Sequence, residues 1–271
     1  MFNLFTTIGM SNNINNNSKN YKILSGSTIK IIAMASMLID HIGASIIDRM
    51  ICVNNYVTVL SYEQMKSIYT VFRCVGRLAF PIFIFLVIEG INHTKNEYKY
   101  LGRMIIFAFI SEIPFDLAFK LSREQIMSGM LLDFSHQNVY FTLALGIAAV
   151  IMIRKIEKIF SDKDKDVVIV MQMLAVAFCM ILAYTFKTDY GYYGVLAIVV
   201  GYILREYILA QNCGICMTLC AVSSTEIFTF FGLIPILLYN GKRGINLKYI
   251  FYAFYPVHLI ALGGIWLALG L

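Results

Sequence analysis

The feature that most limits the fold of this chain is a series of apolar stretches, each about 20 residues long, joined by short polar connections. A helix of about 20 apolar residues is long enough to cross a lipid bilayer. Hydrophobic residues make up 59% of the 271 residues and charged residues only 14%, whereas a soluble domain has about 25% charged residues. The sequence therefore predicts an all-α, polytopic bundle of transmembrane helices in contact with the lipid bilayer.

We expect about eight to nine spans. Residues 213–239 stay ambiguous, because the polar residues 223–226 interrupt an otherwise apolar stretch. They form either one long tilted helix or two short passes. Residues 48–72 are mixed polar and apolar, so we expect them outside the membrane or at its surface. Residues 28–271 would form a single transmembrane domain, preceded by a flexible, Asn-rich amino-terminal tail over residues 1–27. The other predicted spans are 28–47, 73–91, 100–119, 138–153, 167–186, 191–209 and 249–269.

Basic residues concentrate in three of the connections, at 93–103, 154–165 and 242–248. Loops rich in Lys and Arg stay on the cytoplasmic side of a membrane. The three loops fall on one side, together with the amino terminus, when residues 213–239 make two passes. We therefore expect a protein of the bacterial cytoplasmic membrane with a cytoplasmic amino terminus. The net charge of +6 is explained by this orientation, and no basic strip interleaved with aromatic residues predicts binding of nucleic acid.

The first apolar stretch carries ionisable residues that a membrane helix normally avoids. Such side chains usually face a protein interior or a wet cavity. Lys30 and His41 are eleven residues apart, which brings them back to within about 20° of one helical face and separates them by about 16 Å. Asp40 is adjacent to His41, and Asp48 returns near the same stripe. We expect His41 to act as a general base oriented by Asp40, since an unperturbed imidazole has a pKa of about 6.5. The alternative is a snorkelling Lys30 and a buried structural pair.

Two further pairs of charged residues lie in later spans, Arg73 with Arg77 and Glu112 with Asp116. Residues four apart share a helical face. In the predicted topology both pairs lie in the outer half of the bundle, at the depth of His41. Charged residues that merely anchor separate helices in the membrane would not be expected to share one depth. The alternative for the charged pairs is a structural network of ion pairs. The alternative for the histidine of the last span is a core residue whose hydrogen bonds are satisfied within the protein. The residues that we expect to shape a substrate site are Asp48, Arg73, Arg77, Glu112, Asp116, Asp189 and His258.

Several familiar catalytic motifs are absent from the sequence. It has no GxxxxGK[ST], no GxGxxG, no HExxH and no GxSxG, so ATP-driven work, nicotinamide chemistry and zinc proteolysis of the usual kind are not supported. Cys213 and Cys216 form a CxxC pair, but neither a second pair nor a nearby His completes a zinc site. We therefore expect no metal.

Seven blocks of the sequence, in order, carry a resemblance to a known family. The blocks are KIIAMASMLIDHIG (30–43), GRLAFPIFIFLVIEG (76–90), HTKNEYKYLGRMIIFAFISEIPFDLAF (93–119), NVYFTLALG (138–146), DYGYYGVL (189–196), YNGKRG (239–244) and FYPVHL (254–259). They resemble the TraX family of integral membrane proteins, which includes the F-pilin acetylase. This resemblance implies transfer of an acetyl group.

A second, looser resemblance concerns the spacing of Lys30 and His41. It is similar to the basic-x10-His pattern in the first helix of integral-membrane acyltransferases that use acyl-CoA donors. On that analogy His41 activates the acceptor and Lys30 lies near the CoA phosphates. Lys242 and Arg243 would add positive charge for the same phosphates, unless they serve only as an orientation signal.

Together these observations predict a transmembrane acyltransferase-like domain. It would be an acetyltransferase that moves an acetyl group from acetyl-CoA to an amine or hydroxyl on a peptide, glycan or small molecule. One alternative is a proton-coupled transporter, with a relay formed by Asp40, His41, Glu112 and Asp116. The other is a non-catalytic factor for the assembly of pili or surface polymers.

Overall fold

The computed structural model describes residues 22–53, 60–246 and 248–271. Over these residues the chain is helical, with two isolated β-bridges and no β-strand. Most of the predicted tail, residues 1–21, lies outside the described residues. Gly26 and Ser27, which the sequence placed in the tail, already belong to the first helix.

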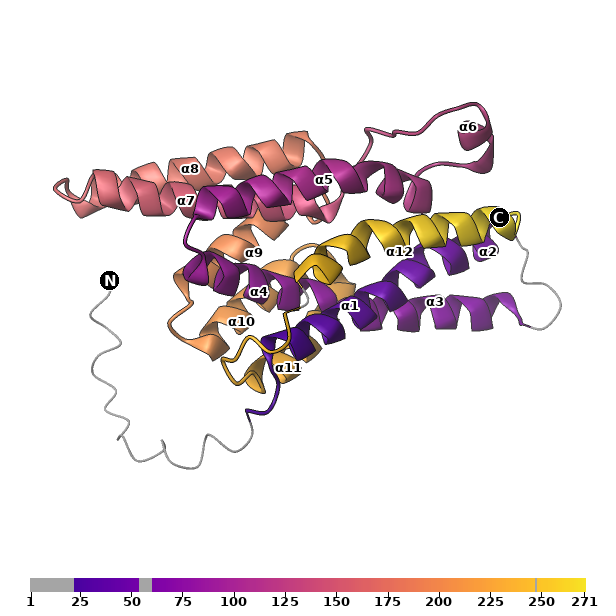
Figure 1. Ribbon diagram of the computed structural model, residues 1–271, viewed down its shortest axis with the longest axis horizontal. Helices are drawn as coiled ribbons and strands as arrows, with labels where there is room; N and C mark the ends of the chain where they lie inside the picture. Colours follow the sequence, from indigo (N-terminus) through magenta and orange to yellow (C-terminus); the bar gives the residue numbers. More distant parts are fainter. Residues whose placement is uncertain (1–21, 54–59, 247) are drawn as a thin grey trace.

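The helices run back and forth along one common direction (Figure 1). In chain order they are α1 (Gly26–Ile42), a π-helical turn η1 (Gly43–Ile47), α2 (Asp48–Cys52), α3 (Tyr62–Gly76), α4 (Ala79–His93), α5 (Glu97–Phe119), α6 (Arg123–Met127), α7 (Val139–Ile159), α8 (Lys165–Thr185), α9 (Gly191–Ile203), α10 (Ile208–Cys220), a 3-10 helix η2 (Ser224–Gly232), α11 (Leu233–Leu237) and α12 (Lys248–Ala268).

Polar side chains begin several of these helices by accepting hydrogen bonds from unpaired backbone N–H groups. The Ser25 side chain accepts from the Thr28 backbone at the start of α1, and the Asn96 side chain accepts from the Lys99 backbone at the start of α5. Ser61 and Gln64 form a reciprocal capping box before α3. These signals set where the helices begin, and therefore where the side chains of the site lie along them.

The sequence placed residues 48–72 outside the membrane or at its surface, but their described part is largely helical, and residues from Tyr62 onward belong to a candidate span. The first helix continues through η1 and α2 to Cys52, and α3 covers Tyr62–Gly76 and packs against α1. Along α3, Met65 is buried while Lys66 and Thr70 are exposed. This one-sided helical period explains the correction, because an amphipathic helix has a mixed polar and apolar sequence without being a loop.

The prediction of eight to nine spans is also corrected. Five helical segments are long and apolar enough to cross a membrane among the described residues. The other apolar helices, α9, α10 and η2 with α11, are too short, and α5 carries three charged residues in its apolar part, Arg103, Glu112 and Asp116. Residues 213–239 are divided at 221–223 and do not form one continuous helix. The five spans are Gly26–Cys52, Tyr62–His93, Val139–Ile159, Lys165–Thr185 and Tyr249–Ala268, and they indicate an integral membrane protein.

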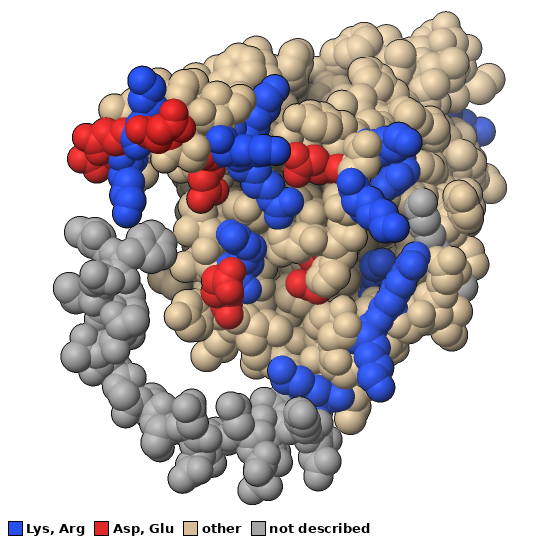
Figure 2. Space-filling view, turned by 60° about the vertical axis from the view of Figure 1, so that its left-hand side comes forward, with Lys and Arg blue, Asp and Glu red and all other residues tan. Residues whose placement is uncertain are grey.

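Basic residues gather at one end of the bundle. The α4–α5 and α7–α8 connections and the loop before α12 lie at one end, which we call the basic end (Figure 1). Lys and Arg side chains gather on this face (Figure 2). The end of α2, the beginning of α3, α6 and the carboxyl terminus lie at the opposite end, which we call the far end.

Candidate active site

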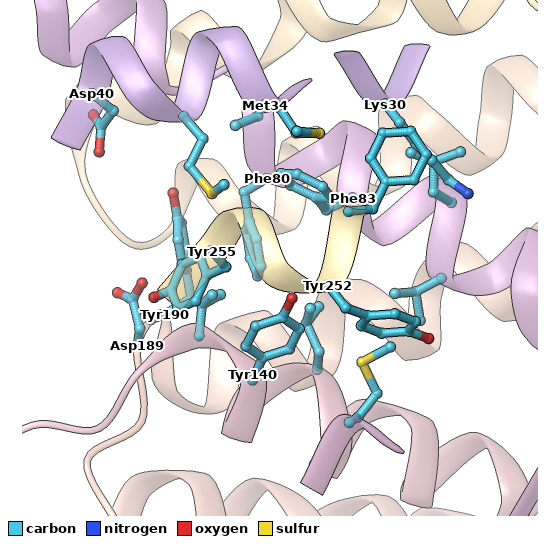
Figure 3. Close-up of a pocket in the computed structure, with 18 of the residues that line it drawn as sticks. Lys30, Met34, Asp40, Phe80, Phe83, Tyr140, Asp189, Tyr190, Tyr252 and Tyr255 are labelled. Atoms are coloured by element: carbon cyan, nitrogen blue, oxygen red, sulfur yellow. Dashed lines mark hydrogen bonds between the residues drawn. The ribbon is translucent and has the colours of Figure 1, made fainter. Parts of the chain in front are cut away.

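A pocket of about 600 Å³ lies between α1, α3, α4, α5, α7 and α12 (Figure 3). Its volume is in the range of pockets that hold small molecules. Arg103 on α5 and Lys120, directly after α5, both line it, and their 17-residue separation corresponds to about 25 Å along a helix. Lys30 lies at one end of the view in Figure 3, and Asp40 and Asp189 lie at the other. The pocket therefore extends along most of the length of the bundle.

His41 lines the pocket and contacts a second histidine. Its Nδ1 lies 2.7 Å from Nε2 of His258, and Nδ1 of His258 lies 2.7 Å from the Phe254 carbonyl oxygen. Because a carbonyl oxygen only accepts, Nδ1 of His258 donates, and Nε2 of the neutral ring accepts from His41. The Nε2 atom of His41 keeps its lone pair and has no hydrogen-bond partner among the described residues. This is the arrangement that a general base needs.

Asp40 does not orient His41, contrary to the prediction. Its carboxylate accepts from Arg73 Nη1 at 2.7 Å and from Arg77 Nη2 at 3.1 Å. Both residues line the pocket. Neighbouring residues of a helix point about 100° apart, so Asp40 reaches its partners on the α3 side while His41 reaches α12. The orienting partner of His41 is His258, which is buried on α12 and does not itself line the pocket.

Asp40 belongs to a group of four charged side chains, the charge cluster, formed by Asp40, Arg73, Arg77 and Glu226; Glu226 is buried, and the other three are partly buried and line the pocket. Arg77 Nη1 lies 2.5 Å from Glu226 Oε1 and 3.3 Å from the Tyr190 hydroxyl. Two positive and two negative charges balance, as buried charges require. The sequence analysis missed Glu226, although a single carboxylate inside the apolar stretch 213–239 was a visible signal.

Gly76 makes the contact between α1 and α3 possible. A Cβ atom at this position would lie 2.1 Å from the Asp40 Oδ1 atom. One turn earlier on α1, the Ser36 hydroxyl donates to the Val75 carbonyl at 2.6 Å. Asp40 therefore reaches its arginine partners across the bare backbone of α3, and only a residue without a side chain fits beneath it.

Three cations line the basic end of the pocket, Lys30, Arg103 and Arg243. None of them pairs with a carboxylate among the described residues. Lys30 Nζ lies 5.1 Å from the centre of the Phe251 ring, and the buried Nε of Arg103 has no hydrogen-bond partner in the described part of the chain. Unpaired cations at a pocket suit phosphate groups. The sequence analysis did not predict Arg103 as a site residue. It predicted Lys242 near the donor phosphates, but Lys242 does not line the pocket.

Glu112 and Asp116 were predicted to shape the site but do not line the pocket. Glu112 accepts from the backbone and side-chain nitrogens of Asn138, and Asp116 accepts from the Asp133 backbone N–H at 2.8 Å. Both carboxylates point into the connection between α5 and α7, because they lie on the face of α5 turned toward that connection. Asp48, on α2, does not line the pocket either.

Asp189 does line the pocket, and its Oδ1 lies 3.7 Å from His136 Nε2 at the far end. Around His41 the wall is aromatic: the Phe119 ring lies 5.0 Å and the Tyr255 ring 6.0 Å from the imidazole, centre to centre. Among the described residues, no group of three or more His, Cys, Asp or Glu side chains could hold a metal ion. The pocket therefore combines cations at one end, a base in an aromatic middle, and both the Asp189 carboxylate and Lys120 at the other end.

Comparison with known proteins gives a family. The sequence model of the TraX protein family matches residues 25–266. The chain is 30% identical to the "Probable fimbrial assembly protein FimC, serogroup H1" of Dichelobacter nodosus, with 86% of this chain and 92% of that protein covered. No solved structure matches it. Since the match takes in nearly all of the helical bundle, including the pocket, this chain belongs to the TraX family.

Proposed function

We propose that this protein is an integral-membrane acetyltransferase that uses acetyl-CoA. The observation that carries the proposal is the unpartnered Nε2 atom of His41, which the His258 ring orients inside a pocket with three unpaired cations at one end. We further propose that the protein lies in the bacterial cytoplasmic membrane with its basic end and amino terminus in the cytoplasm, where loops rich in Lys and Arg are retained.

The residues at the basic end fit an acyl-CoA donor. Lys30, Arg103 and Arg243 offer positive charge for phosphates, and the buried, unpartnered Nε of Arg103 is a hydrogen-bond donor that awaits an acceptor. The distance of about 16 Å from Lys30 to His41 along α1 is a suitable reach for a pantetheine arm. When bound, acetyl-CoA supplies an activated thioester carbonyl.

His41 would carry the proton in the transfer. Its Nε2 atom takes a proton from the amine or hydroxyl acceptor as the acceptor's nitrogen or oxygen forms a bond to the acetyl carbonyl carbon. The carbon–sulfur bond then breaks. His41 returns the proton to the departing thiolate, which gives free CoA and a neutral imidazole. Throughout, His258 accepts the hydrogen bond from His41 Nδ1 and holds the ring in place.

A second candidate function rests on the relative from Dichelobacter nodosus, whose name describes fimbrial assembly. A non-catalytic role in pilus or surface-polymer assembly would use the pocket to bind a subunit without changing it. This candidate predicts that a chain with an inactive His41 still supports assembly. The proton-coupled transporter is less well supported, because Glu112 and Asp116, two members of its relay, lie away from the pocket.

The test is the thermal stability of the purified protein with acetyl-CoA, CoA or adenosine. We expect acetyl-CoA and CoA to raise the melting temperature, because a ligand of the folded state stabilises it. Arg103→Gln should weaken CoA binding by about 10- to 100-fold, the contribution of a hydrogen bond to a charged group. Lys99→Gln is the matched control, since Lys99 is exposed on the same helix at the same end. A folded protein that responds to neither nucleotide would contradict the proposal.

A further inference from the structure

A second cavity lies on the outside of the bundle, apart from the pocket that holds His41. It is a groove of about 740 Å³ between α1, α3, η2 and α11. Among the described residues, none lines both cavities. We call the second cavity the surface groove, and its apolar wall includes Leu24, Ile32, Val71, Leu78, Phe231 and Ile234.

The surface groove opens toward lipid and offers no hydrogen bonds there. Val71, Phe231 and Ile234 are 58%, 53% and 58% exposed, and α1 and α3 both belong to candidate spans. The hydroxyl of Thr70, which also lines the groove, donates to the Lys66 carbonyl of its own helix. Lipid tails are as apolar as these side chains, and an empty hollow would lose its dispersion contacts. The groove therefore suits an acyl chain.

The surface groove ends beside two lysines. The Leu24 backbone N–H donates to the Leu238 carbonyl at 2.9 Å, and both residues line the groove. Lys22 lies two residues before Leu24, and Lys242 lies in the loop before α12, at the basic end of the bundle (Figure 1). Both lysines are exposed, and neither forms an ion pair with a carboxylate among the described residues.

We infer that the surface groove binds an anionic phospholipid of the bilayer. Its acyl chain fills the apolar groove, and its phosphate lies at the basic end beside Lys22 and Lys242. Lysines near a membrane surface attract anionic headgroups, whereas an apolar groove alone would not distinguish one phospholipid from another. The site gives a ligand to Lys242, which does not line the pocket. It does not depend on the proposed enzymatic activity.

A lipid in the surface groove would support the charge cluster from outside. Cys74 and Leu78 line the groove, and the two arginines of the cluster line the pocket from the same stretch of chain. Phe231 lines the groove from η2, the element that also carries Glu226. An acyl chain packed here contacts both elements that the cluster joins. Binding should therefore stabilise the folded protein.

The test is the thermal stability of the purified full-length chain in detergent with dioleoyl phosphatidylglycerol or dioleoyl phosphatidylcholine. The two lipids have the same acyl chains, and only the first carries a net negative charge. We expect phosphatidylglycerol to raise the melting temperature at concentrations where phosphatidylcholine has little effect, because a ligand of the folded state stabilises it. Native mass spectrometry counts the lipids that stay bound.

One pair of variants tests the headgroup. Lys22→Gln combined with Lys242→Gln should weaken binding of phosphatidylglycerol by about 30-fold, since each lysine near a membrane surface contributes about fivefold. Lys158→Gln combined with Lys163→Gln is the matched control. It removes the same charge from exposed positions at the same end of the bundle and should bind phosphatidylglycerol like the wild type.

A second pair of variants tests the acyl chain. Val71→Trp fills the groove from α3 and should abolish binding of phosphatidylglycerol. Val170→Trp on α8 is the control, because Val170 is 54% exposed and does not line the groove. Ile234→Trp fills the groove from the opposite wall and replaces Val71→Trp if that variant does not fold.

Equal stabilisation by the two lipids, or a double lysine variant that binds phosphatidylglycerol like the wild type, would overturn the anionic headgroup. Wild-type binding of phosphatidylglycerol by a folded Val71→Trp or Ile234→Trp variant would overturn the groove as its site.

Discussion

At the scale of single residues, His41 and Asp40 are neighbours in the chain that serve different parts of the molecule. The Asp40 carboxylate binds two arginines across the surface of α3, and the His41 imidazole faces the pocket. The angle of about 100° between successive residues of a helix separates them. Substitutions at these adjacent positions should therefore have different consequences, one for stability and one for catalysis.

Replacing His41 by Gln should abolish proton transfer and leave donor binding intact. We expect the rate of acetyl transfer to fall by about 10²- to 10⁴-fold, the usual contribution of a general base. The measurement is incorporation of radiolabelled acetyl groups in membranes that carry the variant, alongside the CoA-dependent rise in melting temperature. A folded, CoA-binding variant that still transfers acetyl groups at the native rate would show that His41 is not the base.

His258 is a positioning residue, and its replacement should affect turnover more than binding. His258→Leu removes the acceptor for the His41 Nδ1 hydrogen bond, which should lower kcat by about tenfold with little change in KM for acetyl-CoA. His258→Gln keeps an oxygen acceptor on a flexible chain and should recover part of the loss. Equal kcat values for the two variants, with both folded, would leave His258 with a packing role only.

The sequence predicted the position of His41 but not its contact with His258. An eleven-residue interval repeats helical phase, so Lys30 and His41 were expected on one stripe, and both line the pocket. The contact between His41 and His258 joins residues 217 positions apart. Helical period says nothing of such a pair, because it depends on how α12 packs beside α1.

At the scale of helices, the close contact of α1 with α3 depends on a glycine, which has no side chain, at position 76. Gly76 leaves room for Asp40, and Asp40 holds Arg73 and Arg77. The sequence showed the charges but not their pairing, since residues 62–72 have the mixed composition of an interfacial segment. Once these residues are interpreted as an amphipathic helix that packs against α1, Arg73 lies in its last turn and Arg77 directly follows it, so both are close to Asp40. The composition of a segment does not show which face of a helix each charged residue lies on, and the pairing of Asp40 with the two arginines depends on those faces.

A methyl group at position 76 should force these two helices apart. Gly76→Ala should destabilise the protein by about 1–3 kcal/mol, the usual cost of overpacking, because the ion-paired Asp40 cannot move freely. The control is Gly102→Ala on α5, where no atom lies within 4 Å of the added methyl group. The comparison is thermal unfolding of both variants in the same detergent. Similar melting temperatures would mean that the α1–α3 contact adapts without strain.

At the scale of the whole molecule, the sequence predicted an all-helical membrane bundle but overestimated its spans. Apolar stretches can be counted in a sequence, whereas the length of α9 and α10 is decided by the turns at 204–207 and 221–223. The enclosure of the pocket could not be predicted either. Its wall combines side chains from six helices, and their order in space is a property of the packed bundle.

A pocket that reaches both ends of the bundle has a consequence for the membrane voltage. Where solvent enters such a pocket, the voltage falls across the part of the protein that stays dry, and each elementary charge that crosses it is worth about 2.3 kcal/mol per 100 mV. In the proposed transfer, an acetyl group goes to the acceptor as one proton goes to the CoA thiolate, so the exchange is electroneutral. Collapsing the voltage of sealed vesicles with a potassium ionophore should therefore leave the rate of acetyl transfer unchanged, and a rate that follows the voltage would require a charge to cross at His41. A cell that uses such a protein would acetylate its acceptor without drawing on the electrical potential of its membrane.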